Sequence, residues 1–366
     1  MTQNLIINRL SKDTCWTEQD LGGKRPNKSV CIVRYGGYGD MIQIAPVFKY
    51  FKDQGYYVTV NCHSDTSFDI VHNNPNIDEV FLQDRDQVKQ VNVGGFNDLQ
   101  RYWFNLSLLF DRFINLSESV EGSLFAISGR APYEWPKRAR HMYMNHNYFD
   151  MTEAICDIES GEIDRNDLRG FYPTDVERYK AQRFINRIKT KNPNAKIVLW
   201  SLSGSALHKA TPWTDQVLAN FMLHAPDVHF ILTGDKFCKI LEQGWEKESR
   251  VHLRSGSDIR DTLSLIEYVD CVVGPETGVT NCSGQLGIPT ILFCSHSNPN
   301  KVAKYWKNKV CLEPENLPCY PCHILFQKDK DSKVCKRDEE TGATMCTYLI
   351  HADIIRDAIL EVLSSD

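Results

Sequence analysis

Three segments of the chain carry residue types that suit the binding of a phosphate-bearing ligand. They cover residues 34–40, 201–213 and 274–281. Glycines let the backbone of such segments turn sharply and approach a ligand closely, while hydroxyls, amides and an ammonium group converge well on a diphosphate. Each segment follows a short apolar run and precedes a helical pattern, and helix N-termini favour anions. The pattern therefore predicts a site for a phosphate-containing ligand.

The first segment reads R-Y-G-G-Y-G-D and ends on Asp40, where a helix is expected to begin. Asp40 could therefore cap that helix or face a ligand. The segment has neither the G-x-G-x-x-G of a dinucleotide-binding turn nor the lysine of a P-loop. Hydride transfer and nucleoside triphosphate hydrolysis are both disfavoured.

The two later segments hold the candidate anion-binding groups. Lys209 follows a serine- and glycine-rich turn, a pattern that a plain surface loop also shows. Thr277 is a natural N-cap, which leaves the neighbouring Glu276 without a capping role. The candidate residues of these two segments are Ser203, Gly204, Ser205, Lys209, Glu276, Thr277, Gly278 and Asn281.

Strands separated by helix-length segments run through the chain, which predicts parallel α/β sheets. In such sheets ligands bind beyond the carboxyl ends of the strands, where all three segments lie. The 366 residues suffice for about two domains at roughly 150 residues each, and a polar connection interrupts the pattern near residues 159–175. We expect an N-terminal domain over residues 1–170 and a C-terminal domain over residues 171–366, with a cysteine-rich tail and a closing amphipathic helix.

The composition, with 42% hydrophobic and 24% charged residues, is that of a folded globular protein. The formal charge of -5 means that a polyanionic partner would need a local basic face. No apolar run approaches the roughly 20 residues that span a bilayer, and the polar leader of about 28 residues does not resemble a signal peptide. We therefore expect a protein of the cytoplasm of a bacterial or phage-infected cell, with a peripheral place at the inner membrane left open.

Taken together and in this order, the three segments resemble the heptosyltransferase-like (family-nine) glycosyltransferases. The resemblance rests on R-x-G-x-x-G-D, on S-G-S with a following Lys and Pro-Trp, and on G-P-E-T-G before G-I-P-T. It covers roughly residues 29–355, and the sequences FINLSESVEG and YPCH are similar to the phage-borne branch. It implies an α/β GT-B fold, in which two Rossmann-like domains with parallel sheets face a central cleft.

The resemblance also implies roles for individual residues. Asp40 matches the base that takes a proton from an acceptor hydroxyl, and Lys209 matches the lysine that holds the departing diphosphate. The residues expected to bind a nucleotide-diphosphate sugar, similar to ADP-heptose, are Ser203, Gly204, Ser205, Glu276, Thr277, Gly278 and Asn281. Those expected to bind the acceptor are Gly37, Tyr38, Gly39, Lys137, Arg138 and Arg140. No cofactor is expected for catalysis.

Several positions depart from the family pattern. Asn281 stands near the place where the family often has His, and Ser replaces the usual Pro-Gly at the start of the second-domain loop. Glu276 stands where the family usually has Asp, and would accept hydrogen bonds from donor hydroxyls. The donor sugar and nucleobase are therefore left open.

Two kinds of sequence pattern could bind a metal ion, a cluster of cysteines and the motif D-x-D. Cys319, Cys322, Cys335 and Cys346 are spaced C-x2-C-x12-C-x10-C, which could hold a structural zinc ion, with reduced or partly disulfide-linked thiols as the alternative. A metal-dependent transferase would need D-x-D after a strand. The D-x-D motifs at residues 84–86 and 329–331 are of a kind common on solvated turns. We expect metal-independent transfer.

The leading hypothesis is an inverting glycosyltransferase that acts on a hydroxyl of an anionic acceptor, such as a lipopolysaccharide core glycan. Basic and aromatic residues interleave over residues 133–143, whereas most basic runs, including the one with Lys301 and Lys307, are solvated faces. A phage enzyme that glycosylates hydroxymethylated DNA bases is one alternative and would bind with strong salt dependence. The others are a GT-B sugar-nucleotide epimerase and a catalytically silent sugar-nucleotide binding protein. The oligomeric state is left open.

Overall fold

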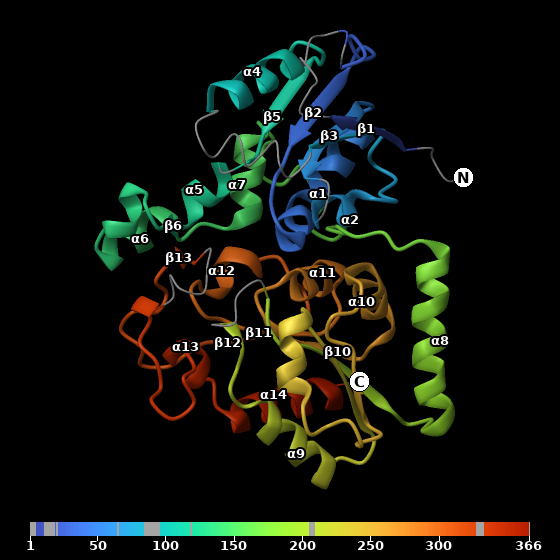
Figure 1. The fold of residues 1–366 in the computed structure, drawn as a ribbon, viewed down its shortest axis with the longest axis vertical. Coiled ribbons are helices and arrows are strands. Elements are labelled where there is room, and N and C mark those ends of the chain that lie inside the picture. Colours follow the sequence, from blue (N-terminus) through green and yellow to red (C-terminus); the bar gives the residue numbers. More distant parts are fainter. Residues whose placement is uncertain are drawn as a thin grey trace. The chain divides into compact units, whose positions relative to one another are not determined.

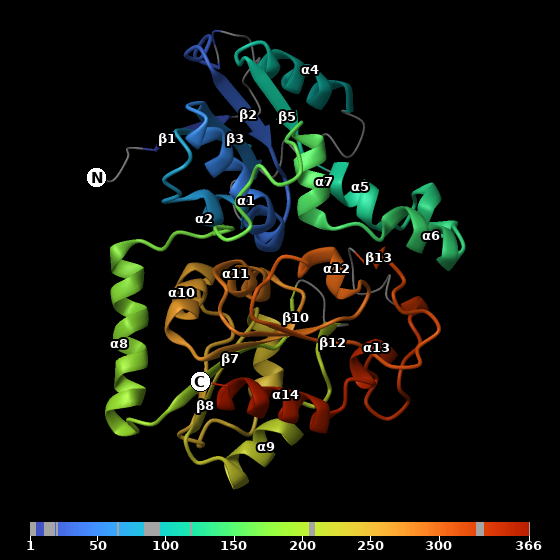
Figure 2. The same ribbon diagram turned by 180° about the vertical axis from the view of Figure 1, so that it is seen from behind.

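The computed structural model describes residues 5–10, 19, 21–63, 66–83, 96–117, 119–204, 209–326 and 333–365, and the structural statements below refer to these residues. The chain forms two compact units (Figures 1 and 2). Unit 1 comprises Met1–Glu121 and Phe149–Tyr172, and unit 2 comprises Gly122–Tyr148 and Pro173–Asp366. The expected division at residue 170 lies close to the last crossing between the units. The segment 122–148, however, belongs to unit 2, although it precedes residue 170 and the sequence analysis places it in the N-terminal domain.

Unit 1 is built around a parallel sheet of five described strands in the order β1-β4-β3-β2-β5. The strands are β1 (Ile6–Leu10), β2 (Ser29–Val33), β3 (Tyr57–His63), β4 (Glu79–Gln83) and β5 (Arg112–Asn115). β2 is buried along its whole length, as its β-branched sequence SVCIV predicts for an inner parallel strand. The helices of this unit are α1 (Tyr38–Asp53), α2 (Thr66–Val71), α4 (Phe96–Ser107) and α7 (Tyr148–Ile155).

The polar leader contains a strand that the sequence analysis does not predict. β1 pairs in parallel with β4, with Ile6 opposite Glu79. Ile6 and Ile7 are 50% and 44% exposed, so this edge strand lacks the apolar alternation that distinguishes a half-buried strand from a loop. The interpretation of these residues as leader alone is wrong.

Unit 2 contains a parallel sheet of six described strands in the order β12-β11-β10-β7-β8-β9. The strands are β7 (Lys196–Ser201), β8 (Val228–Thr233), β9 (Val251–Leu253), β10 (Cys271–Pro275), β11 (Thr290–Phe293) and β12 (Lys309–Leu312). The helices are α8 (Asp175–Lys191), α9 (Thr214–His224), α10 (Ile259–Leu265), α11 (Gly278–Leu286), α12 (Pro299–Val302), α13 (Met345–Tyr348) and α14 (Ala352–Ser364), with the 3-10 turns η3 (Lys236–Glu242) and η4 (Ile266–Tyr268). α9 and α14 lie on the opposite side of the sheet from α10 and α11 (Figures 1 and 2).

The core of unit 2 lies between its sheet and the helices α9 and α14. Trp200 of β7 is fully buried, and its ring centroid lies 6.1 Å from that of Phe230 and 6.2 Å from that of Phe293. Ile355 and Ile359 of α14 are buried in the same cluster. The expectation of a closing amphipathic helix is therefore confirmed. None of the helices in the described ranges combines the length and the apolar composition required to cross a bilayer.

The segment 122–148 is attached to the late part of unit 2 by backbone hydrogen bonds. It includes the end of α5 (Ser119–Leu124), then β6 (Ala126–Ile127), the 3-10 turn η1 (Ala131–Glu134) and α6 (Lys137–Met144). β6 pairs in parallel with β13 (Ile324–Leu325), and the Ala126 amide donates to the His323 carbonyl at 2.8 Å. The cysteine-rich tail is thus packed against residues from the first half of the sequence.

Two histidines stack on neighbouring strands of unit 2. The rings of His229 and His252 are 5.6 Å apart and nearly parallel, with Nδ1 of His229 3.4 Å from Nε2 of His252. Burial, and secondarily His229 and Lys191, lowers the pKa of His252 to about 4. Burial and then Arg250 also lower the pKa of His229. Both rings are therefore neutral in the folded protein at neutral pH.

We expect acid to destabilise this part of the protein through His252. Its folded-state pKa of about 4 lies below the unfolded value of about 6.5, so the unfolded chain binds the proton first as the pH falls. The stability that neutral His252 contributes is complete above pH 6.5 and is lost between about pH 6.5 and pH 4. The melting temperature of His252→Gln should therefore fall less steeply from pH 7 to pH 5 than that of the wild type. The matched exposed variant His224→Gln should keep the wild-type slope, and an unchanged slope in His252→Gln would contradict the interpretation.

Candidate functional site

The segments 201–213 and 274–281 leave the sheet of unit 2 at the same edge. β7 and β10 pair in parallel, with Trp200 opposite Val273, so the loops that follow them begin side by side. A Cβ atom on Gly274 would lie 2.5 Å from the Ser201 carbonyl oxygen, and the φ of Gly274 is +155°. Both the contact and the dihedral angle require glycine. The backbone of one loop thus touches the backbone of the other.

Side chains extend this contact. A Cβ atom on Gly204 would lie 2.9 Å from Cγ2 of Thr277, and the hydroxyls of Ser201 and Thr277 are 3.3 Å apart. Lys209 is 8% exposed, and its Nζ donates to the Glu276 carbonyl at 3.2 Å. The structure therefore brings together residues that the sequence analysis places in one donor site. Ser203 is buried in the same loop, while Ser205 lies outside the described residues.

The third segment forms the N-terminus of α11. Thr277 is its N-cap, because its Oγ1 accepts from the Thr280 amide at 3.4 Å, while Thr280 Oγ1 accepts from the Thr277 amide at 3.0 Å. Gly278 begins the helix. Asn281 is 4% exposed, and its Oδ1 has no hydrogen-bond partner among the described residues. A buried polar atom without a partner costs about 1–3 kcal/mol, so this oxygen is available to accept a hydrogen bond from a ligand or a water molecule.

Among the described residues, the contacts of the Glu276 carboxylate are to one of its two oxygens, Oε2. Its Oε2 accepts from the Ser297 hydroxyl at 3.0 Å and lies 3.5 Å from Nε2 of His296. The Glu276 side chain is 17% exposed and that of His296 only 6%. The sequence analysis overlooks His296 and Ser297, although they follow β11, the strand that pairs with β10. The rule that ligands bind beyond the carboxyl ends of parallel strands would have found them.

In unit 1, Asp40 occupies the start of α1. Its Oδ2 accepts from the Gly37 amide at 2.8 Å, and its Oδ1 lies 2.9 Å from Nη2 of the fully buried Arg34. Of the two alternatives, the structure thus bears out the capping contact of Asp40. The Asp40 side chain is nevertheless 32% exposed, which leaves it accessible to a ligand.

The other predicted acceptor residues of this loop line the same turn. Gly37 is the N-cap of α1 and Tyr38 is its first residue, with the Tyr38 hydroxyl donating to Asp69 Oδ2 at 3.3 Å. Gly39 follows in the first turn of the helix. These residues therefore lie next to Asp40 in unit 1, and their role in binding an acceptor stays a prediction.

The predicted basic acceptor residues lie elsewhere, on α6 in unit 2. Lys137 Nζ donates to the carbonyls of Pro318 and Tyr320 at 2.7 and 2.6 Å, and Arg140 Nε donates to the Cys322 carbonyl at 2.9 Å. Both cations thus hold the cysteine-rich loop, which corrects the expectation that they form a face of the first domain. Arg138 is exposed on the same helix.

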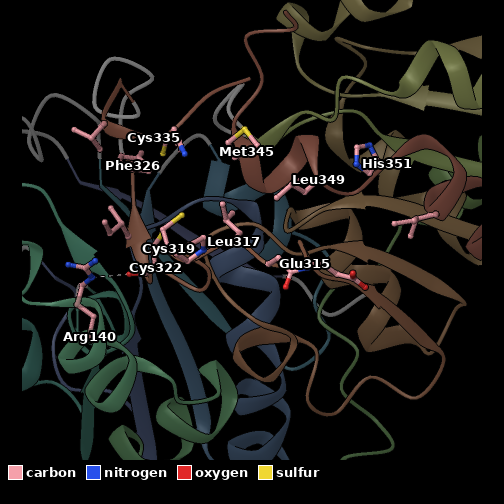
Figure 3. A pocket seen from close by; sticks show the side chains of 16 residues that line it. Arg140, Glu315, Leu317, Cys319, Cys322, Phe326, Cys335, Met345, Leu349 and His351 are labelled. Atoms are coloured by element: carbon pink, nitrogen blue, oxygen red, sulfur yellow. Dashed lines mark hydrogen bonds between the residues drawn. The ribbon is translucent and has the colours of Figure 1, made fainter. Parts of the chain in front are cut away.

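The four late cysteines line one small cavity of about 50 Å³. Figure 3 shows three of them around the larger cavity beside it, with the hydrogen bond from Arg140 to Cys322. Burial raises the pKa of Cys322 to about 11 and that of Cys335 to about 12, so these thiols are protonated at neutral pH. Within the described ranges no group of three or more His, Cys, Asp or Glu residues is arranged to hold a metal ion. The zinc prediction for Cys319, Cys322, Cys335 and Cys346 is therefore not supported, and the D-x-D motifs at residues 84–86 and 329–331 fall outside the described residues.

Comparisons with known proteins bear on the fold. No protein-family model and no curated protein matches the sequence. Among solved structures, a glycosyl transferase family 9 protein of Veillonella parvula is 15% identical, with a TM-score of 0.62 over 93% of this chain and 98% of the other. The ADP-heptose lps heptosyltransferase II of E. coli is 11% identical, with a TM-score of 0.57 over 92% and 98% of the two chains. The iron-containing dodecameric glycosyltransferase TibC of enterotoxigenic E. coli is 13% identical, with a TM-score of 0.54 over 93% and 80%.

These likenesses extend over most of each chain and show that the protein has the GT-B fold of these glycosyltransferases. The predicted α/β fold class with parallel sheets is confirmed. The central cleft and the roles of individual residues stay predictions.

The contact between Gly204 and Thr277 gives a test of the site geometry. Gly204→Ala places a Cβ 2.9 Å from Thr277 Cγ2, so we expect overpacking to lower the free energy of unfolding by about 1–3 kcal/mol. Adding Thr277→Ser removes Cγ2 and keeps a capping hydroxyl, so the double variant should regain most of the loss in melting temperature. Thr277→Ser alone is the matched control. Equal melting temperatures for wild type and Gly204→Ala would show that the two loops do not touch at this point.

Proposed function

We propose that the protein is a glycosyltransferase that moves a sugar from a nucleotide-diphosphate donor to an acceptor hydroxyl. The observation that carries this proposal is the cluster of Lys209, Thr277 and Asn281 at the ends of β7 and β10. A buried ammonium group, the first amides of a helix and an unpartnered amide oxygen suit a ligand that combines phosphates with hydrogen-bond donors. Unit 2 binds the donor in this proposal, and unit 1 binds the acceptor.

The donor is proposed to resemble ADP-heptose. One support is that a solved structure with this fold is described as an ADP-heptose lps heptosyltransferase. Another is Glu276, whose Oε2 is engaged by Ser297 while no hydrogen bond from the described residues reaches Oε1. An ionised carboxylate accepts hydrogen bonds only, so Oε1 suits the hydroxyls of a sugar.

The proposed reaction is a single displacement with inversion at the anomeric carbon. The acceptor oxygen forms a bond to that carbon as its proton passes to the Asp40 carboxylate, and the bond to the diphosphate oxygen breaks with its electron pair leaving on the diphosphate. Lys209 and the amides at the start of α11 stabilise the charge that develops there. We propose metal-independent transfer because Lys209 supplies positive charge where the leaving group departs.

The proposed acceptor is an anionic glycan, for example of the lipopolysaccharide core. Lys137 and Arg140 already bind backbone carbonyls, so Arg138 is the predicted basic residue on α6 that remains exposed for an anion. The alternative acceptor is DNA with hydroxymethylated bases. A steep dependence of acceptor binding on salt concentration would favour DNA over a glycan. Isomerised donor formed without any acceptor would instead favour a sugar-nucleotide epimerase.

Lys209→Met tests the donor site, because it keeps the aliphatic stem and removes the charge. A hydrogen bond to a charged group contributes about 1.5–3 kcal/mol, so we expect the Kd for the best nucleoside diphosphate to rise roughly 10- to 100-fold. A thermal-shift panel of ADP, UDP, GDP and CMP, each with its sugar, identifies that nucleotide in the wild type. The exposed variant Lys247→Met should bind like the wild type. Unchanged binding to Lys209→Met would remove the lysine from the donor site.

Asp40→Asn tests the base and keeps an oxygen that can accept from the Gly37 amide. We expect kcat for transfer to fall by roughly 10²- to 10⁴-fold, the usual contribution of a general base. The donor-induced thermal shift should stay as in the wild type, because Asp40 lies in the other unit from the donor residues. The melting temperature of the free variant controls for the lost charge opposite Arg34. Transfer at the wild-type rate would exclude Asp40 as the base.

A further inference from the structure

Lys301 differs from the other lysines of its run, because its side chain is completely buried. The sequence pattern predicts a solvated face that includes Lys301 and Lys307, and only the second of these is exposed. The Lys301 ammonium donates to the Leu124 carbonyl and lies 4.1 Å from the centroid of the Phe125 ring. Both partners come from the segment 122–148. A buried ammonium group requires such partners.

The charge state of Lys301 depends on its burial and on the charged groups near it. Burial lowers the pKa of Lys301 to about 7, while Glu276 and, secondarily, Cys322 act to raise it. The neighbouring His323 carries no charge at neutral pH, because burial and then Lys301 lower its pKa to about 3. The interaction with Glu276 is therefore the main electrostatic influence that favours the charged form of Lys301.

One loop supplies the contacts to the Glu276 carboxylate. Ser297 and His296, which reach Oε2, lie between β11 and α12, the short helix that carries Lys301. Phe125 packs against the His296 ring at 5.5 Å between centroids, so the segment that covers Lys301 also supports His296. These three residues, His296, Ser297 and Lys301, are called the positioning cluster below.

We propose that the positioning cluster fixes the Glu276 carboxylate with Oε1 presented to the sugar of the donor, and that Lys301 thereby determines how strongly the protein prefers a nucleotide sugar over the free nucleotide. This inference rests on the proposed function. Glu276 lies next to the proposed diphosphate site, because its backbone carbonyl accepts a hydrogen bond from Lys209 Nζ. A site built to hydrogen-bond a hydroxyl discriminates strongly against a ligand that lacks it.

Lys301→Met tests the proposal through the ratio of two dissociation constants. With ADP and ADP-heptose, or the nucleotide pair that the thermal-shift panel selects, we expect the Kd for the nucleotide sugar to rise roughly 10-fold or more. The Kd for the free nucleotide should change by less than about 2-fold, because Lys209 and α11 hold the diphosphate. Lys307→Met is the matched control and should leave both constants unchanged. A purely structural Lys301 would weaken both ligands together or neither, and either result overturns the proposal.

A double-mutant cycle with Glu276→Gln separates a role through Glu276 from a direct one. In the Glu276→Gln background we expect Lys301→Met to have little further effect on the Kd for the nucleotide sugar. The same loss in both backgrounds would overturn the proposal.

A milder variant covers the case in which Lys301→Met does not fold. Ser297→Ala removes one hydrogen bond to Oε2 without uncovering a buried charge, and should weaken nucleotide-sugar binding roughly 3- to 10-fold with free-nucleotide binding unchanged. Unaltered selectivity in Ser297→Ala would overturn the role of the cluster.

Wild-type protein that binds neither nucleotide nor nucleotide sugar would overturn the proposed function itself, and the inference with it. Wild-type binding with unaltered selectivity in the variants would overturn the inference alone.

Discussion

The contact between two loop backbones at the ends of β7 and β10 is the constraint on which the proposed donor site depends. Gly274 approaches the Ser201 carbonyl so closely that any side chain would collide with it. That approach sets the distance between the hydroxyls of Ser201 and Thr277 and lets Lys209 reach the Glu276 carbonyl. The chemistry proposed for unit 2 therefore follows from a steric property of neighbouring parallel strands, and the side chains refine an arrangement that the backbones establish.

Much of the fold could be predicted from the sequence because buried parallel strands have a strong signal. β2 and β10 are short, β-branched and buried at every position, and each precedes a glycine-containing turn and a helix. β1 has no such signal, because it lies at the edge of the sheet with its isoleucines partly exposed. Its pairing with β4 is a contact between residues far apart in the chain, which a pattern of nearby residues does not record.

The same distinction explains which residues of the candidate site could be predicted. Lys209 and Thr277 each carry a local signal, namely a serine- and glycine-rich turn or a capping threonine after a strand. Lys301 has no local signal, since its neighbours in sequence include exposed lysines and its burial depends on Leu124 and Phe125. Lys137 shows the reverse error, since its basic surroundings suggest an anion site and its partners are carbonyls about 180 residues away.

The segment 122–148 makes unit 2 discontinuous, since the chain enters it, leaves it after Tyr148 and returns at Pro173. During synthesis these residues emerge long before β13, the strand that β6 must pair with. Phe125 and the Leu124 carbonyl therefore cannot contact Lys301 until most of the chain has been synthesised. The pairing that completes unit 2 can therefore form only after β13 has been synthesised.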